Sequence, residues 1–531
     1  MIDSGGMLAL VMFGCLCAAI MAGYPVAFTL AGVALLFAGI AAILASAGLI
    51  DVFIDPTFVT LLPERIFGLI KNEVLLAVPM FILMGVLLER SRVAEDLLES
   101  MGKLFGKTRG GLGLSVILVG ALLAASTGIV GATVVTMGLL SLPTMLARGY
   151  DTRLATGTIA ASGTLGQIIP PSIVLVLLGD VMGNAYQEAQ QAQGLFAFAP
   201  LSVGHLFAGA LLPGLGLVAL YMLYVAVIAW LSPERAPALV DDGPREDGLA
   251  LKAVKAMIPP IVLILAVLGS ILTGLATPTE AAAIGAVGAL LLGGLRCCDG
   301  RGKGLIIAAL VSLAVLIILA LSGTVFEAVK QGGSAAAIAK YGAIALIVIT
   351  SLGIVASLKE LWTGRVLAPA LESTMEVTTM VYTIFIGAAL FSLVFRGLGG
   401  DETVHQLLTD LPGGTLGAML AVMALMFFLG FFLDFIEIVF VVVPIVAPTL
   451  LILGVDPVWL AVMIAINLQT SFLTPPFGFA LFYLRSVCPE GVKTSDIYRG
   501  ALPYVAIQIA ALILLALVPS VATWLPSVVF G

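Results

Sequence analysis

Side chains that could bind a cation stand directly before each of two double prolines in this chain. Hydroxyl, amide and carboxylate oxygens are the ligands that hard cations prefer. Proline and glycine also free backbone carbonyl oxygens that a regular helix would occupy. The residues in question are Thr158, Ser162, Gly163, Thr164, Gly166 and Gln167 before Pro170-Pro171, and Asn467, Gln469, Thr470, Ser471 and Thr474 before Pro475-Pro476. This pattern predicts two broken helices, 152–184 and 457–487, that present oxygen ligands to sodium.

Polar residues also interrupt two long apolar runs, 112–147 and 415–453. The interrupting residues are Ser126, Thr127, Gly128 and Gly131 in the first run and Asp434 and Glu437 in the second. The two carboxylates are three positions apart and share a helix face, and at a membrane centre each costs about 2.5 to 3.5 kcal/mol, which favours a functional role. Because about 20 residues suffice to cross a membrane, each run is predicted to be a re-entrant hairpin whose tip stops inside it.

The hairpins and broken helices belong to two related halves of the chain. Segments 143–171 and 448–476 align at a constant offset of 305 residues. Identical pairs in this alignment include Pro143/Pro448, Gly149/Gly454, Asp151/Asp456 and the double prolines. In secondary transporters, substrates and coupling ions bind where two repeats meet, on interrupted helices. The duplication therefore predicts a transport function.

The composition sets the class of protein. Of 531 residues, 61% are hydrophobic and only 10% are charged, which is typical of an all-α polytopic membrane protein. The longest polar stretch is 232–250, so no sizeable soluble domain is expected. The five cysteines and two histidines form no metal or proton-relay pattern, and no nucleotide-binding or hydrolase motif is present. The sequence therefore offers no set of residues that would support an enzyme. Two opposed hairpins favour alternating access over a continuous channel.

Charge placement predicts the topology, because cytoplasmic loops collect Lys and Arg. Basic residues flank both ends of the first hairpin, namely Lys103, Lys107, Arg109, Arg148 and Arg153, whereas acidic residues flank the second, namely Asp401, Glu402, Asp410 and Asp456. One hairpin therefore starts from each side of the membrane, which makes the repeats inverted. The same count places both termini on the outer face of a bacterial inner membrane.

Close helix packing is the alternative explanation for single Gly, Ser and Thr residues in membranes. It is the better explanation for any one of them, whereas two polar helix breaks at equivalent positions exceed what packing requires. Glu280 lies near a helix start in the sequence TPTEAA, where a carboxylate meets the positive end of the helix dipole. We expect a structural role for Glu280.

Six motifs resemble the large membrane subunit, of the DctM type, of tripartite ATP-independent periplasmic (TRAP) transporters. They are GYPVAFTLAG (23–32), VPMFILMGVLLERS (78–91), ASTGIVGATVVTMGLLSLPTMLARGYD (125–151), GTLGQIIPPSI (163–173), ATPTEAAAIGAV (276–287) and FLDFIEIVFVVVPIVAP (432–448). The resemblance implies a sodium-coupled elevator importer of small carboxylate solutes, with no organic cofactor. It also implies two partners, a small four-helix membrane subunit and a periplasmic solute-binding protein.

The resemblance also implies where ligands bind. Sodium ligands would be Ser126, Gly131, Gly163, Gly166, Asp434, Asn467, Gln469 and Ser471. The solute would lie between the hairpin tips, near Ser126, Thr127, Gly128, Thr164, Gln167, Glu437, Thr470 and Thr474. Arg485 is the nearest candidate to clamp a carboxylate, and it is equally a candidate cytoplasmic anchor.

The expected division of the chain is into scaffold and transport domains. The scaffold would comprise 1–72, 201–378 with a cytoplasmic linker 232–255, and a C-terminal helix 499–531, and the transport domain would comprise 73–200 and 379–498. Two extra apolar segments between 305 and 357 depart from the family pattern. The sequence PPFGFALFYLRSV (475–487) and Glu437 resemble a branch that carries 2-oxo acids or related monocarboxylates. A stand-alone sodium/carboxylate symporter or a sodium/proton antiporter of the same superfamily is the rival function.

Overall fold

The computed structural model describes residues 3–50, 60–91, 93–105, 108–128, 130–195, 200–238, 249–298, 300, 302–322 and 333–531. These residues form helices and connecting loops, with no β-strand among them. In this described part, nine helices are long and apolar enough to cross a membrane, or up to eleven if two bent helix pairs are each counted as one span. The predicted all-α polytopic membrane class is confirmed.

Each half of the chain contains a helical hairpin followed by a broken helix. The first half has α6 (Gly111–Thr127), α7 (Val130–Ala147), α8 (Thr152–Thr164), the 3₁₀ turn η2 (Leu165–Gln167) and α9 (Ile173–Ala192). The second half has α18 (Gly414–Leu429), α19 (Phe435–Val441), α20 (Val443–Ile452), α21 (Pro457–Leu473) and α22 (Phe479–Val487). Both predicted hairpins and both predicted helix breaks are present.

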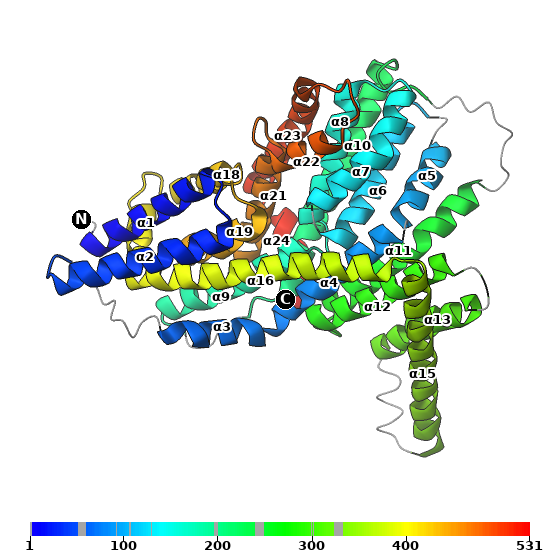
Figure 1. The fold of residues 1–531 in the computed structure, drawn as a ribbon, viewed down its shortest axis with the longest axis horizontal. Helices are drawn as coiled ribbons and strands as arrows, with labels where there is room; N and C mark the ends of the chain where they lie inside the picture. The colour runs from blue at the N-terminus through cyan, green and yellow to red at the C-terminus, as the bar shows by residue number, and fades with distance from the viewer. Residues whose placement is uncertain are drawn as a thin grey trace.

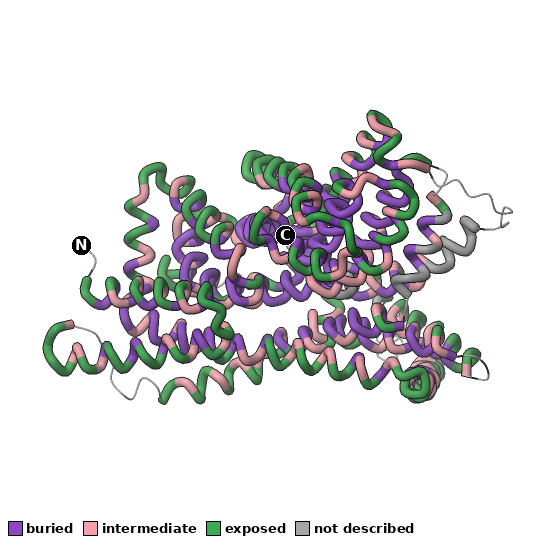
Figure 2. The backbone as a smooth tube through the Cα atoms, turned by 45° about the horizontal axis from the view of Figure 1, so that its top comes forward, coloured by how far each residue is buried: buried purple, intermediate pink, exposed green. Residues whose placement is uncertain are grey.

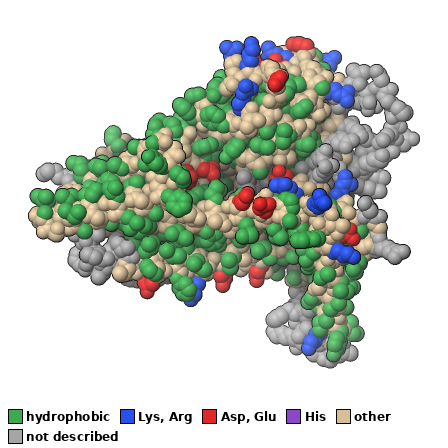
Figure 3. Space-filling view, viewed as in Figure 1, with side chains coloured by type: hydrophobic (Ala, Val, Ile, Leu, Met, Phe, Trp, Pro, Cys, Tyr) green, Lys and Arg blue, Asp and Glu red, His purple; other side chains and the backbone are tan. Residues whose placement is uncertain are grey.

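Hydrogen bonds show that the first hairpin begins and ends on one side of the molecule. The backbone N–H of Gly110, before α6, donates to Ala236 O at 2.9 Å, and that of Asp151, after α7, donates to Arg235 O at 2.9 Å. Arg153 and Asp496 form an ion pair at 3.2 Å on this same side. Figure 3 shows blue basic side chains gathered over the ends of α8, α10 and α23.

The remaining helices surround these two repeats (Figure 1). They are α1 (Ser4–Met21), α2 (Val26–Ser46), α3 (Leu62–Lys71), α4 (Glu73–Arg90), α5 (Val93–Phe105), α10 (Val203–Leu231), α11 (Leu249–Leu272), α12 (Pro278–Cys297), α16 (Leu367–Gly397), α17 (Gly400–Thr409), α23 (Thr494–Leu517) and α24 (Ser520–Phe530). The long helix α16 packs against α2 and α4, and α4 also packs against α12, α6 and α9. Helix α4 thus contacts both the outer helices and the first repeat.

The two extra apolar segments form two helices that pack on each other and on α12, and the second of them projects downward from the body (Figure 1). These helices are α13 (Lys303–Leu321) and α15 (Gly333–Thr363). A small cluster containing Leu291, Ile306 and Ala309 joins the pair to α12. Helix α15 is longer than the predicted segment 341–357.

Other boundaries differ from the prediction where amphipathic or proline-containing sequence was involved. The expected C-terminal helix 499–531 is two helices, α23 and α24, because Pro519 stands between them and cannot donate a backbone hydrogen bond. Three short helices, α3, α5 and α17, were not predicted, since their mixed polar and apolar sequences resemble connecting loops. Most of the linker 232–255 lies outside the described residues.

The first arms of the broken helices are buried along most of their length, and Figure 2 shows buried residues gathered in the middle of the molecule. Every residue of α8 from Leu154 to Thr164 and every residue of α21 from Leu460 to Leu473 is buried. A helix that is buried on all sides is surrounded by protein rather than lipid. The polar residues of these two helices are therefore held deep inside the molecule.

Candidate functional site

The two broken helices meet at equivalent positions of the two repeats. The amide nitrogen Nε2 of Gln469 donates to Thr164 Oγ1 at 3.3 Å, and these residues are 305 positions apart. This is the offset that aligns the two halves of the sequence. A contact between equivalent residues lies on the axis that relates the repeats, so the polar stretches meet at the centre of the protein.

Both double prolines separate two helical arms, and each contains a cis peptide bond. In the first repeat α8 ends at Thr164, η2 follows, and Ser172 then caps α9. The Ser172 hydroxyl accepts from Leu175 N at 3.4 Å and donates to Gln167 O at 3.0 Å. In the second repeat α21 ends at Leu473, and the nine-residue helix α22 begins at Phe479. The predicted breaks at Pro170, Pro171, Pro475 and Pro476 thus expose helix ends within the core.

The tip of the first hairpin touches the start of α9. Gly128 has φ +61°, and a Cβ atom on it would lie 3.1 Å from the backbone nitrogen of Ile173, the first residue of α9. Only glycine tolerates both this backbone conformation and this approach. The tip therefore lies at the positive end of the α9 dipole, a favourable place for an anion. The side chains of Ser126 and Thr127 lie outside the described residues.

The tip of the second hairpin carries the two predicted carboxylates in a capping box. Asp434 Oδ1 accepts from Phe435 N at 2.7 Å, and Glu437 Oε2 accepts from the backbone N–H of Asp434 at 2.9 Å. Glu437 is buried, whereas Asp434 is exposed. Each of these bonds uses one oxygen of its carboxylate. The pair thus stabilises the start of α19, and each carboxylate has further lone pairs that could meet a ligand.

An aromatic cluster joins this second tip to the start of α22. The ring centroids of Phe431 and Phe432 lie 6.1 and 5.4 Å from that of Phe477. Phe477 follows the second double proline directly. Both hairpin tips therefore contact the region where the second arm of their own broken helix begins.

Tyr483 of α22 lies between the two hairpins and was not predicted. A Cβ atom on Gly131, near the first tip, would lie 3.0 to 3.3 Å from carbon atoms of the Tyr483 ring. The charges of Asp434 and Glu437, at the second tip, act on the Tyr483 hydroxyl. In the sequence, only the position of Tyr483 after the second double proline could have pointed to it.

The arms of the broken helices also exchange contacts between repeats. Helix α22 packs on α7 of the first hairpin, and α9 packs on α20 of the second hairpin. At the end of α9, Gln193 Nε2 donates to Ile452 O at 3.3 Å. The site is thus built by both repeats together.

Several predicted sodium ligands hold the broken helices against the hairpins. Asn467 Nδ2 donates to Met423 O at 2.8 Å, and Ser471 Oγ donates to Phe427 O at 2.6 Å, which ties α21 to α18. Gly163 has a packing role, because a Cβ atom there would lie 3.2 Å from backbone atoms of Val134 in α7. Asn467 and Ser471 still have oxygen lone pairs that could coordinate a cation.

Three other predicted residues make contacts only within their own segment, or lie inside it. Thr470 Oγ1 donates to Ile466 O, and Thr474 Oγ1 donates to Thr470 O, both at 2.7 Å. Gly166 is buried within η2. The three residues therefore lie close to the helix breaks, and no contact of theirs reaches the hairpin tips among the described residues.

Two buried carbonyl oxygens near the helix crossing need a partner. Gln167 Oε1 and Gln469 Oε1 have no hydrogen-bond donor within the described part of the chain. Their side chains are 1% and 0% exposed. Leaving a buried acceptor unpaired costs about 1 to 3 kcal/mol, so a bound cation would stabilise this arrangement. The chemistry of the donors fits sodium.

Arg485 contacts the backbone beyond its own helix. Its guanidinium donates to the backbone carbonyl oxygen of Val492, in the loop that leads to α23. Because that loop lies on the basic face of the molecule, this contact favours the anchor role that the sequence also allowed.

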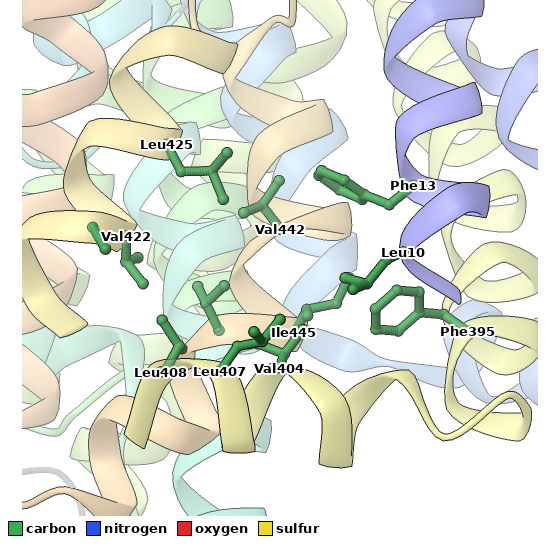
Figure 4. A pocket seen from close by; sticks show the side chains of 12 residues that line it. Leu10, Phe13, Phe395, Val404, Leu407, Leu408, Val422, Leu425, Val442 and Ile445 are labelled. Atoms are coloured by element: carbon green, nitrogen blue, oxygen red, sulfur yellow. The ribbon is translucent and has the colours of Figure 1, made fainter. Parts of the chain in front are cut away.

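Two cavities lie beside the second hairpin rather than at its tip. One of about 210 Å³ is lined by apolar side chains of α1, α16, α17, α18 and α20, including Phe13, Phe395 and Ile445 (Figure 4). The other, of about 290 Å³, is lined in part by Arg65, Glu188 and Arg396. Arg396 pairs with Glu188 at 3.0 Å and with Asp401 at 3.1 Å, which links α16 to α9 and α17.

A fully helical membrane fold with two repeats, each containing a hairpin and a helix broken at a double proline, defines this chain as a membrane transport protein rather than an enzyme. The comparison with known families agrees. The chain matches the family described as Tripartite ATP-independent periplasmic transporter, DctM component, over residues 13–341 and 301–521. It belongs to this family, as a large permease subunit.

Named relatives cover most of the chain. It is 27% identical to the C4-dicarboxylate TRAP transporter large permease protein DctM of Vibrio cholerae, over 86% of each chain. It is 26% identical to the sialic acid TRAP transporter large permease protein SiaM of the same organism, over 98% of each chain. The crystal structure of the Alcanivorax borkumensis YdaH transporter matches with a TM-score of 0.52 and 16% identity over 86% of this chain and 87% of that one, a likeness of fold alone.

Proposed function

We propose that this chain imports small carboxylate solutes together with sodium ions. The observation that carries the proposal is the meeting of the two broken helices, where the oxygens of Gln167 and Gln469 are buried and unpaired within the described residues. Sodium is a small cation that binds such neutral oxygens. Asp434 and Glu437 supply negative charge at the second hairpin tip.

Sodium is proposed to bind at two sites, one at each hairpin. The first set comprises Ser126, Gly131, Gly163 and Gly166, and the second comprises Asp434, Asn467, Gln469 and Ser471. In the second set Asn467 and Ser471 already fix α21 against α18. An ion held there would join the hairpin tip to the broken helix, so that both move as one body.

The solute is proposed to lie between the hairpin tips, among the predicted residues named above. Gly128 and the start of α9 offer backbone N–H groups and the positive end of a helix dipole to a carboxylate. The ring of Tyr483 lies against Gly131 near the first tip, and its hydroxyl could donate a hydrogen bond to the solute. The relatives named for C4-dicarboxylates and for sialic acid both carry carboxylic acids, and a 2-oxo acid or related monocarboxylate is the proposed solute here.

The proposed mechanism is an elevator in a bacterial inner membrane, with both termini periplasmic. The transport domain 73–200 and 379–498 would move against a scaffold formed by the rest of the chain. A small four-helix membrane subunit would complete the scaffold, and a periplasmic solute-binding protein would deliver the solute. The extra helices α13 and α15 pack on α12, which belongs to the proposed scaffold.

The test is uptake of radiolabelled pyruvate and succinate into proteoliposomes that contain this chain and its small subunit. Uptake should require both an inward sodium gradient and the binding protein. Uptake by this chain alone would favour the rival stand-alone sodium/carboxylate symporter. Sodium efflux driven by an inward proton gradient, without solute, would favour the sodium/proton antiporter.

A further inference from the structure

A buried polar cluster extends from the helix crossing to α10 and α23, two helices outside the repeats. Gln508 of α23 and Tyr221 of α10 are both 0% exposed, in helices long and apolar enough to cross the membrane. Gln508 Nε2 donates to Tyr221 Oη at 2.7 Å. Gln469, from the helix crossing, lies on α21, which packs against both α10 and α23, and its amide is close enough to act on the same Tyr221 hydroxyl. One phenol oxygen is thus shared by amides from two helices.

Two acceptor oxygens of this cluster lack a donor. Neither Gln508 Oε1 nor Gln469 Oε1 has a hydrogen-bond partner in the ranges that the structure describes. Gln469 Oε1, already proposed as a sodium ligand, has two lone pairs and could bridge two ions. Exchanging the amide N and O of Gln508 would let Tyr221 donate to the oxygen, but it would leave the N–H donors of the amide unpaired instead. Each unpaired buried group costs about 1 to 3 kcal/mol. The side chains alone therefore cannot satisfy one another.

The hydroxyl of a neighbouring tyrosine, Tyr504, has a hydrogen-bond partner, unlike the amide oxygens of the cluster. Thr158 Oγ1 donates to Leu154 O, so the Tyr504 hydroxyl, 2.7 Å from Thr158, is the donor in that contact. The rings of Tyr504 and Tyr221 pack edge to face with centroids 5.1 Å apart. The two tyrosines are therefore neighbours in one buried region, but only Tyr221 contacts the amides whose oxygens lack partners.

We propose that Gln469, Gln508 and Tyr221 form a further site for a monovalent cation, sodium, behind the helix crossing. The inference rests on the proposed function and adds residues from outside both repeats to it. Carbonyl and hydroxyl oxygens suit a hard cation. The three residues bring no carboxylate, so a monovalent ion matches them better than a divalent one. Such an ion would connect α21 to α10 and α23.

The test is the sodium dependence of thermal unfolding of the purified full-length chain, measured in sodium, potassium and choline chloride at equal ionic strength. A ligand that binds the folded state raises its melting temperature by mass action. Gln508→Met and Tyr221→Phe should raise the sodium concentration for half-maximal stabilisation by about tenfold or abolish one phase of it. Tyr504→Phe, the matched control, should leave that concentration unchanged. Melting in choline chloride shows whether each variant folds.

Equilibrium dialysis with radiolabelled sodium gives an independent count. Gln508→Met should bind one ion fewer than the unchanged protein. Unaltered sodium stoichiometry and midpoint in both variants would overturn the proposal and leave a water molecule as the occupant. If Asp434→Asn alters the sodium response while Gln508→Met does not, only this further site fails. If the unchanged protein does not respond to sodium, the proposed coupling fails as well.

Discussion

The tip of the first hairpin is built from small residues, whereas the tip of the second is built from aromatic rings and two carboxylates. At the offset of 305, Phe431 and Phe432 stand where the first half has Ser126 and Thr127. The backbone plan is nevertheless shared, because each tip contacts the start of the second arm of its own broken helix. The duplicated backbone supplies the helix breaks, and later divergence supplies different chemistry at each tip.

This difference suggests a division of labour between the repeats. A small tip at the positive end of α9 suits a carboxylate solute, which carboxylates nearby would repel. The acidic tip of the second hairpin suits a cation. Tyr483 lies against Gly131 and within reach of the charges of both carboxylates, and it belongs to neither tip. The predictions below test this division in order of expected effect.

Replacing Asp434 by asparagine should have the largest effect. Asparagine caps a helix about as well as aspartate, so α19 should keep its start while the negative charge is lost. Sodium-driven uptake should fall by about 100-fold or more, as expected for a lost ion ligand. Uptake and the melting temperature in choline chloride are the two measurements. A large loss of stability in choline with uptake per folded molecule unchanged would mean that Asp434 only caps the helix.

Replacing Tyr483 by phenylalanine should weaken solute binding without removing it. A hydrogen bond to a charged group contributes about 1.5 to 3 kcal/mol, so the half-saturating solute concentration should rise by about tenfold or more. The maximal rate and the sodium dependence should change little, because the ring remains packed on Gly131. Initial rates across a range of solute concentrations test this. A changed sodium midpoint with unchanged solute affinity would place the hydroxyl at the cation instead.

Replacing Gly128 by alanine should lower both stability and uptake several-fold. A left-handed backbone costs a non-glycine residue about 1 to 2 kcal/mol, and the added Cβ would press on Ile173. Gly454→Ala is the matched control, since Gly454 has φ +87° with no atom of the described structure within 4 Å of an added Cβ. Both variants should melt lower, and only Gly128→Ala should lose uptake per folded molecule. Equal uptake in the two variants would contradict a role for the first tip.

The smallest expected effect concerns Asp401 of α17, whose partner Arg396 also pairs with Glu188 of α9. Burial raises the pKa of Asp401 from 3.8 to about 6, although Arg396 opposes the shift. The folded protein therefore holds a proton that the unfolded chain releases, and stability falls as pH rises from 3.8 through about 6. Asp401→Asn should raise the melting temperature slightly near neutral pH, with the gain shrinking as the pH is lowered. A lower melting temperature at neutral pH would mean that the pair with Arg396 dominates.

Patterns that extend over many residues made the fold predictable. Run length, the glycine at the first tip and the double prolines located both hairpins and both breaks. Glu280 was expected to have a structural role, and it forms a capping box with Thr277. The similar box formed by Asp434 and Glu437 was not foreseen, because the cost of a carboxylate in a membrane drew attention to ion binding alone.

Single polar residues in apolar helices were harder to interpret. Gln508, Tyr221 and Tyr483 have no repeating pattern around them, and their significance depends on which helices pack together. Only the folded structure brings Gln508 to Tyr221 and Tyr483 to Gly131. The side chains of Ser126 and Thr127 lie outside the described residues, so their predicted roles stay predictions.

The most direct test of the account is to follow radiolabelled sodium and radiolabelled solute together in the same proteoliposomes, with the binding protein outside and no gradient imposed. Addition of solute should draw sodium inward at a fixed ratio, and Asp434→Asn should lose both fluxes together. Solute entry without accompanying sodium would contradict sodium coupling at the junction of the two repeats.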